Sequence, residues 1–311
     1  MKMSYKICLI CGKPLLSNNE SNYHNECLKS FFGSLDIPDI NFDDENIDDI
    51  AKENILEGDV VAGVQKKVSL STNSKRTKKH IITNKYIIKP HHSKYPLLNE
   101  YEWLGNRLAA LSGFNVVSSG LFKYKEKYIY ITKRVDRKYV NGEFTKIHME
   151  DFCQLIGKLT KDKYEGSYES PVKYVINKYS NLKQFDKLEY FRMIFFSYII
   201  GNTDMHLKNF SLITNGKYTK LCPFYDIVPV LMIVNQLDMA LTINGKSRNI
   251  TKNDFLKFAE NINLDKRLAI TAMNSIINKY NKMVELISSS TLNEKEQSKF
   301  INFIISQINK F

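Results

Sequence analysis

Several features that mark other protein classes are missing from this sequence. No apolar run approaches the ~20 residues that a membrane-spanning helix needs, and the longest, residues 193–200, has the length of a core helix segment. Residues 1–6 lack the apolar core of a secretory signal peptide. No internal repeat is present in the sequence. These absences argue against membrane and repeat proteins and predict a cytoplasmic location.

Acidic residues are outnumbered by basic ones, and cysteines are few. The sequence has 33 acidic residues and 45 lysines and arginines, which gives a formal net charge of +12. This excess predicts attraction to polyanions such as nucleic acid, nucleotide phosphates or an acidic partner, without choosing among them. The five cysteines are an odd count, and three lie in the first 27 residues, which favours metal binding over disulfides. The 311 residues, 43% of them hydrophobic, can bury a large core in one or two domains.

The first three cysteines have the spacing of a zinc site. Cys8 and Cys11 are separated by two residues, as are His24 and Cys27, so each turn can present two ligands to one tetrahedral ion. Four protein ligands leave no open position for catalysis, so we expect a structural zinc knuckle within residues 1–35. The alternative is a reduced thiol cluster without metal. The acidic stretch that follows, residues 36–55, is expected to be a linker or a short solvated helix.

The strongest chemical pattern is the polar segment at residues 201–210, Gly-Asn-Thr-Asp-Met-His-Leu-Lys-Asn-Phe. Asp204 and Asn209 have the Asp-x-x-x-x-Asn spacing of a protein-kinase catalytic loop, where the carboxylate orients the attacking hydroxyl and the amide holds magnesium. A hairpin turned at residues 215–216 is expected to return Asp226 to the same place as a second metal ligand. For the Asp-x-x-x-x-Asn spacing alone, a polar loop capping a buried helix is the alternative.

The segment before this loop is predicted to be a buried helix. Apolar residues recur at positions 188, 191, 194, 195, 198 and 199, the period of a core-facing helix, and Gly201 is placed to end it. A rigid helix that delivers a reactive loop suits catalysis by positioning. Lys208 is a candidate to offset charge on a transferred phosphoryl group. His206 could hydrogen-bond within the loop or toward the metal-binding carboxylate, or be purely structural.

Residues 201–210 also resemble the signature of HipA-type serine/threonine kinase toxins, and Pro-Phe-Tyr-Asp at residues 223–226 resembles their metal-binding segment. The resemblance covers most of residues 8–230. It implies an α+β, bilobal protein-kinase-like fold, with a β-rich N-lobe at residues 56–134 and a mainly helical C-lobe at residues 135–311.

The same resemblance implies nucleotide-binding positions. Lys89, which ends an expected strand, matches the lysine that holds the α- and β-phosphates. Glu102, in a helix expected from about residue 97 to 112, is its expected partner, with Glu100 as the other candidate. Arg-Val-Asp-Arg at residues 134–137 resembles the hinge motif, which places adenine beside the backbone of Ile131 and Lys133. The phosphate loop is matched by Val61, Ala62, Gly63, Val64, Gln65 and Lys67.

Two departures from the family pattern are visible. The positions that match the family's autophosphorylated serine hold Val60 and Ala62, so self-inactivation there is not predicted. The chain also begins without room for the extra N-terminal subdomain of full-length HipA proteins. In this it resembles the short HipT-like form, in which a separate small HipS-like protein supplies the missing piece.

The rest of the chain is expected to be mainly helical, with β-structure falling away after residue 137. Residues 148–155 are expected to open a helix, and residues 241–246 to form a hairpin. Residues 251–254 have the pattern of a helix cap, with aspartate in place of glutamate. Residues 265–287 and 293–311 are expected to be two amphipathic helices.

These observations predict a magnesium- and ATP-dependent kinase that transfers the γ-phosphate to a protein serine or threonine. By resemblance, an aminoacyl-tRNA synthetase is the expected substrate, and a HipB-like antitoxin is the expected partner and the only link to DNA. A zinc-containing adaptor without catalysis, which binds nucleic acid or an antitoxin, is one alternative. A small-molecule or lipid kinase is another, because phosphoinositide kinases share the Asp-x-His-x-x-Asn layout.

Overall fold

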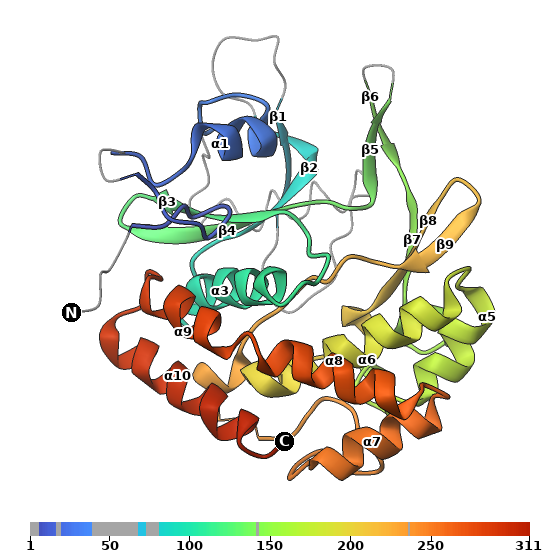
Figure 1. Cartoon of the computed structure of the whole chain (residues 1–311). Helices are drawn as coiled ribbons and strands as arrows, with labels where there is room; N and C mark the ends of the chain where they lie inside the picture. Colours follow the sequence, from blue (N-terminus) through green and yellow to red (C-terminus); the bar gives the residue numbers. More distant parts are fainter. Residues whose placement is uncertain (1–5, 17–19, 39–67, 73–80, 141–142, 236) are drawn as a thin grey trace. The chain divides into compact units, whose positions relative to one another are not determined.

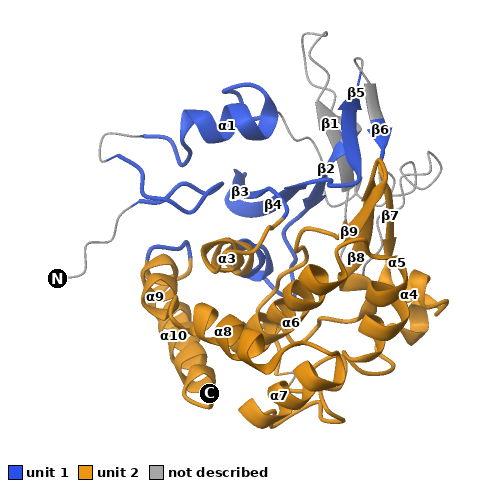
Figure 2. Ribbon diagram, turned by 45° about the vertical axis from the view of Figure 1, so that its right-hand side comes forward, with its two compact units in different colours: residues 1–103, 117–146, 289–291 blue, residues 104–116, 147–288, 292–311 orange. Residues whose placement is uncertain are grey.

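A computed structural model describes residues 6–16, 20–38, 68–72, 81–140, 143–235 and 237–311 (Figure 1). The chain divides into two compact units, which Figure 2 colours separately. Unit 1 comprises residues 1–103, 117–146 and 289–291, and unit 2 comprises residues 104–116, 147–288 and 292–311. Unit 1 is rich in strands and unit 2 is mainly helical, so the fold is mixed α and β as predicted.

Unit 1 is built on a four-stranded antiparallel sheet with the strand order β1-β2-β4-β3. Its central strand β4 buries four consecutive residues, Tyr130 and Ile131 among them, as a strand does when both its faces are covered. A hairpin of β5 and β6 follows the sheet. The strands are β1 (Val68–Thr72), β2 (Ile81–Lys89), β3 (Ser119–Tyr124), β4 (Lys127–Lys133), β5 (Arg137–Val140) and β6 (Glu143–Lys146).

The amino-terminal segment of unit 1 packs on this sheet. Helix α1 (Asn25–Phe32) buries Phe31 and Phe32, and both rings contact Tyr86 of β2 and Phe122 of β3. The Tyr86 hydroxyl donates a hydrogen bond to the Phe31 carbonyl. The main-chain N–H of Leu121 in β3 donates to the Leu9 carbonyl at 2.9 Å, so the segment that carries the cysteines is tied directly to the sheet.

Unit 2 is organised around helix α6 (Lys183–Ile200), which contacts α8 and α10 (Figure 1). Nearly every side chain of α6 from Tyr190 to Ile200 is buried, so the helix is a core element on almost all sides. Helix α3 (Leu98–Leu111) contributes its last eight residues to this unit. The other α-helices are α4 (Phe152–Leu155), α5 (Asn177–Tyr179), α7 (Lys252–Asn261), α8 (Lys266–Ile277), α9 (Tyr280–Ser288) and α10 (Glu294–Ile308).

Three expectations about local structure were wrong. Residues 148–151 are not helical but form strand β7 (His148–Asp151), because they pair with β8 (Ser211–Asn215) in a three-stranded sheet completed by β9 (Tyr218–Leu221). The β8–β9 turn comprises residues 216–217, one residue later than expected, since Asn215 pairs with Tyr218. The helix expected over residues 265–287 is interrupted between α8 and α9.

Two other local expectations were confirmed. Thr251 caps α7 in a reciprocal arrangement with Asp254, as the sequence pattern predicted. Ile243 and Lys246 pair across residues 244–245 as a tight turn, although only as an isolated bridge. Among the helices that the structure describes, none is both long and apolar enough to cross a bilayer.

Candidate active site

The polar loop begins where α6 is forced to stop. Gly201 has the left-handed conformation, with φ 74°, and its N–H closes the last turn of α6 onto the Ser197 and Tyr198 carbonyls. A Cβ atom at this position would lie 2.8 Å from the Phe303 ring, so any other residue would strain the backbone and clash with the ring. A buried helix with an obligatory glycine end therefore sets the starting point of the loop.

The loop is closed by hydrogen bonds that converge on Asp204. Its carbonyl accepts from the His206 N–H at 2.9 Å and from the Asn209 side-chain amide at 2.8 Å. The Asn209 N–H in turn donates to the His206 carbonyl at 2.9 Å. Because the Asn209 nitrogen is committed to Asp204, the amide orientation is fixed, and its oxygen is the atom left to serve as a cation ligand. The structure therefore joins Asp204 and Asn209 in one hydrogen-bonded turn.

A segment 40 residues upstream also contacts this loop. The Tyr164 hydroxyl donates to Asp204 Oδ1 at 2.9 Å, and the Lys163 carbonyl accepts from the Leu207 N–H at 3.1 Å. The buried Tyr168 hydroxyl donates to the Met205 carbonyl at 2.8 Å. Sequence reasoning missed this segment, because no spacing pattern connects it to the loop.

His206 is an almost completely buried imidazole, 6% exposed. Burial, followed by the nearby charge of Lys163, lowers the pKa of His206 to about 4, while the Asp226 carboxylate acts in the opposite direction. His206 is therefore neutral at pH 7, and its ring meets Tyr164 edge to face at 5.1 Å between centroids. The influence of Asp226 on His206 indicates that this carboxylate lies near the loop.

Asp226 reaches this position through the β8–β9 hairpin. Tyr225, directly before it, donates a hydrogen bond from its hydroxyl to the Lys208 carbonyl at 3.0 Å and accepts one from the Ser211 hydroxyl at 2.6 Å. Asp226 itself has a left-handed backbone, φ 56°, which is uncommon for a residue other than glycine. A backbone held in a sparsely populated conformation is found preferentially at functional sites.

The Lys208 side chain is engaged in a separate ion pair. Its ammonium forms an ion pair with Asp151 at 2.6 Å, and both side chains are largely buried. Asp151 also caps α4, so the pair fastens the loop to the end of β7. A role for Lys208 at a transferred phosphoryl group requires this ion pair to open.

Unit 1 contains a buried ion pair of its own. Lys89 Nζ lies 2.5 Å from Glu102 Oε1, and the two side chains are only 5% and 2% exposed. Asn99 donates to the carbonyls of Lys89 and Tyr128, at 3.1 and 3.0 Å, so α3 is fixed against the ends of two strands. Glu100, the other candidate partner, is also buried, and burial raises its pKa to about 7.

The segment expected to contact adenine is part of the sheet. Ile131 pairs with β2 on one side and β3 on the other, and the Lys133 N–H donates to the Ser118 carbonyl at 2.8 Å. Because this N–H is already bonded, a contact between adenine and the Lys133 backbone would use the carbonyl oxygen of Lys133. Asp136 forms ion pairs with Arg134 and Arg137, at 2.8 and 2.5 Å, which fix the following turn. The expected phosphate loop, residues 61–67, lies outside the described residues.

The amino-terminal cysteines of unit 1 form a metal-type cluster with His24. One ligand atom from each of Cys8, Cys11, His24 and Cys27 lies within 4.8 Å of all the others. His24 Nδ1 is 3.4 Å from the Cys11 sulfur and 3.7 Å from the Cys27 sulfur. His24 Nε2 lies 3.0 Å from the Pro14 carbonyl, and a hydrogen bond there leaves Nδ1 as the ligand atom.

The three thiols of this cluster differ in acidity. A hydrogen bond from Cys11 lowers the pKa of the Cys8 thiol, whereas the same hydrogen bond raises the pKa of Cys11 and burial raises that of Cys27. Three sulfurs and one imidazole nitrogen are a common donor set for a structural zinc ion. The residues present therefore fit zinc.

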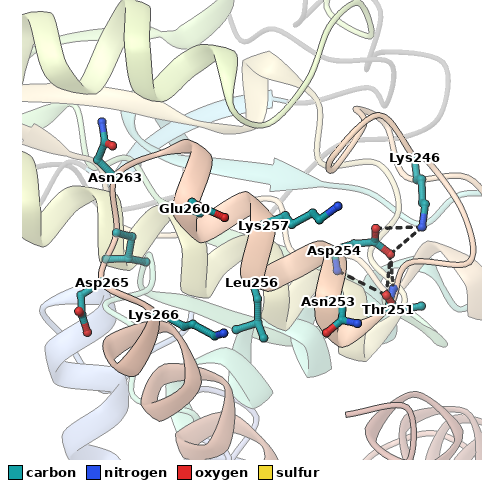
Figure 3. Close-up of a pocket in the computed structure, with 11 residues that line it drawn as sticks. Lys246, Thr251, Asn253, Asp254, Leu256, Lys257, Glu260, Asn263, Asp265 and Lys266 are labelled. Atoms are coloured by element: carbon teal, nitrogen blue, oxygen red, sulfur yellow. Dashed lines mark hydrogen bonds and ion pairs between the residues drawn. The ribbon is translucent and has the colours of Figure 1, made fainter.

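A separate hollow of about 850 Å³ lies at the surface of unit 2, beside α7 and the start of α8 (Figure 3). Its principal acid, Asp254, accepts hydrogen bonds from Thr251 and Lys246 and so serves the cap of α7. The residues that line it include none of the site residues predicted from the sequence. We assign it no chemistry.

Comparison with known proteins places the chain in a family. The protein-family model described as "HipA-like C-terminal domain" matches residues 60–286 of the sequence. A Haemophilus influenzae protein named "Putative kinase" is 28% identical over 91% of both chains. The serine/threonine-protein kinase toxin HipA of Shewanella oneidensis is 27% identical over 70% of this chain, which spans only 54% of that protein.

Solved structures agree on the fold. The structure of the Shewanella oneidensis HipA, HipB and operator DNA complex superposes with a TM-score of 0.69 at 20% identity, covering 96% of this chain and 80% of that one. The Helicobacter pylori proinflammatory kinase CtkA superposes with a TM-score of 0.52 at 16% identity, covering 73% of this chain and 87% of that one. The fold is thus shared with these two kinases, and the cluster of three cysteines and His24 in unit 1 has the donor set of a zinc site. The chain belongs to the HipA-like C-terminal domain family.

Proposed function

We propose that the protein is a cytoplasmic serine/threonine kinase that transfers the γ-phosphate of ATP to a protein hydroxyl. The observation that supports this most strongly is the closed turn that joins Asp204 to Asn209, together with the hydrogen bond that ties Tyr225, directly before Asp226, to the Lys208 carbonyl of the same loop. Two acids and one amide around one loop form the arrangement that phosphoryl transfer uses for its base and its metal ligands.

Each residue has a proposed role. When bound, ATP would supply the phosphoryl group, and magnesium would offset the negative charge of the phosphates. Asp204 orients the acceptor hydroxyl and takes its proton, and the Asn209 oxygen and the Asp226 carboxylate hold the magnesium ion. In unit 1, Lys89 holds the α- and β-phosphates, and Glu102 positions Lys89 through their buried ion pair.

The remaining site residues have supporting roles in this proposal. His206 stays neutral and packs the loop, because its depressed pKa makes it a poor base at pH 7. Lys208 offsets charge during transfer once it leaves Asp151. In this proposal residues 61–67 cover the phosphates, and backbone groups from about Ile131 to Lys133 contact the adenine.

We further propose that the protein acts as a toxin of a toxin–antitoxin system. Support comes from the two Shewanella oneidensis HipA matches, one named a kinase toxin and the other solved with HipB and operator DNA. On this proposal a HipB-like antitoxin binds the protein and is its only link to DNA. A small HipS-like protein supplies an amino-terminal subdomain, and an aminoacyl-tRNA synthetase is the substrate.

The cysteine cluster adds a structural zinc ion to this proposal. Cys8, Cys11, His24 and Cys27 would fill all four positions of a tetrahedral site, so zinc would stabilise unit 1 without contacting substrate.

Two measurements test the kinase proposal. ATP should raise the melting temperature only when magnesium is present, which a nucleic-acid-binding adaptor would not show. Expression of the wild type should create a new protein phosphosite and slow growth, whereas Asp204→Asn should do neither. Identical phosphoproteomes would contradict the proposal, and transfer only to small molecules or lipids would support the other kinase class.

A further inference from the structure

The contact between Tyr164 and Asp204 has no role in the function proposed so far. The phenol donates to Asp204 Oδ1 at 2.9 Å, within the 2.6–3.2 Å that separates a general base from the group whose proton it takes. Asp204 is the proposed base, so an internal hydroxyl stands where an acceptor hydroxyl is expected. Tyr164 is 46% exposed, so part of this residue is open to solvent.

The surrounding structure holds the Tyr164 side chain in this position. The neighbouring Lys163 carbonyl is bound to the loop through the Leu207 N–H, and the Tyr168 hydroxyl is bound to the Met205 carbonyl. The Tyr164 ring also packs edge to face on His206. An acceptor held beside its base in this way reacts intramolecularly, without the entropy cost of bringing two molecules together.

The phenol also keeps its proton. Burial, followed by the negative charge of Asp204, raises the pKa of Tyr164 well above its usual value. At neutral pH the group is a neutral hydroxyl that needs a base before it can attack. Asp204 is within reach to act as that base.

We propose that Tyr164 is a self-phosphorylation site, an inference that rests on the proposed kinase function. The phenol oxygen forms a bond to the γ-phosphorus of ATP, the bond from that phosphorus to the β–γ bridging oxygen breaks, and ADP leaves. The phenol proton passes to Asp204. The product carries about −1.5 to −2 charge beside the Asp204 carboxylate, which repels incoming phosphate and occupies the acceptor position. Self-phosphorylation at Tyr164 therefore switches the site off.

The test uses the purified full chain with magnesium and ATP, with phosphosites read by mass spectrometry over time. Wild type should gain phosphate on Tyr164. Asp204→Asn should gain it roughly 10²–10⁴-fold more slowly, the usual contribution of a general base. Tyr218→Phe, at an exposed tyrosine of β9, is the matched control and should behave as wild type.

The reaction should occur within one molecule. Its rate constant should not change with protein concentration, and Asp204→Asn protein mixed with wild type should stay unmodified at Tyr164. ADP formation by wild type should decline as Tyr164 phosphate accumulates, whereas the progress curve of Tyr164→Phe should stay linear.

Two results would overturn the inference, and they are distinguishable. ADP formation or other phosphosites in wild type, with Tyr164 unmodified, would show an active kinase in which Tyr164 only orients Asp204. Neither ADP nor any phosphosite in wild type would reject the kinase proposal together with this one.

Discussion

Replacing Glu102 by glutamine should destabilise unit 1, because it removes the carboxylate that forms a buried ion pair with the Lys89 ammonium. Lys89 and Glu102 are 2.5 Å apart, and their side chains are 5% and 2% exposed. Removing one partner of a buried pair typically costs about 3–5 kcal/mol of folding free energy. Glutamine keeps the shape of the glutamate side chain and one acceptor oxygen. We therefore expect the free energy of unfolding to fall by about 3 kcal/mol, at the lower end of that range.

Trp103 provides a convenient probe for this measurement. It is the only tryptophan in the chain, directly follows Glu102, and is completely buried. Its fluorescence during urea unfolding should show a midpoint lowered by about 1–3 M for Glu102→Gln. Urea is preferred to guanidinium because it does not screen charge.

The matched control is Glu126→Gln, which breaks an exposed pair with Lys123. The Lys123 and Glu126 side chains are 55% and 92% exposed, so their interaction contributes about 1 kcal/mol at most. A double variant, Lys89→Met with Glu102→Gln, should be less destabilised than the two single changes add up to. Additive effects, or a Glu102→Gln midpoint equal to that of Glu126→Gln, would refute the reasoning.

Four further predictions concern the metal sites and the buried titratable groups. Asp226→Asn should weaken the magnesium dependence of ATP binding. The fold should stay intact, since asparagine tolerates the left-handed backbone of this position. Calorimetric titration of ATP with and without magnesium measures the effect. Wild-type protein should contain one zinc ion per chain by elemental analysis and Cys11→Ser should contain less, with a lower melting temperature; zinc-free wild type of equal stability would contradict this. The pKa of His206 is about 4 in the fold against about 6.5 unfolded, so the free energy of unfolding should fall as the pH drops from about 6.5 to 4. The pKa of Glu100 is raised to about 7, so Glu100 should have the opposite effect and lower the free energy of unfolding as the pH rises from about 4.5 to 7. Urea titrations of His206→Gln and Glu100→Gln at several pH values distinguish the contribution of His206 from that of Glu100.

The parts of the site that the sequence could predict are local. The loop at residues 201–210 is one continuous segment, and the helix before it has a clear apolar period, so both could be placed without a structure. Gly201 ends that helix in the left-handed conformation, as its position suggested. Lys89 and Glu102, 13 residues apart, form the ion pair that family spacing had indicated.

The parts that the sequence could not predict depend on distant contacts. Tyr164 and Lys163 reach the loop only because unit 2 folds them against it, and nothing in their spacing indicates this. The ion pair between Lys208 and Asp151 joins residues 57 positions apart. Residues 148–151 form a strand because β8 pairs with them, which shows tertiary pairing overriding local preference.

The most direct test of the central proposal compares wild type with Asp204→Asn for ATP affinity and for phosphoryl transfer under the same conditions. We expect similar magnesium-dependent binding of ATP by both proteins. Transfer should be roughly 10²–10⁴-fold slower in Asp204→Asn, since only the base is removed. Equal transfer rates in the two proteins, or no transfer by wild type that binds ATP, would contradict the assignment of Asp204 as the base of a kinase.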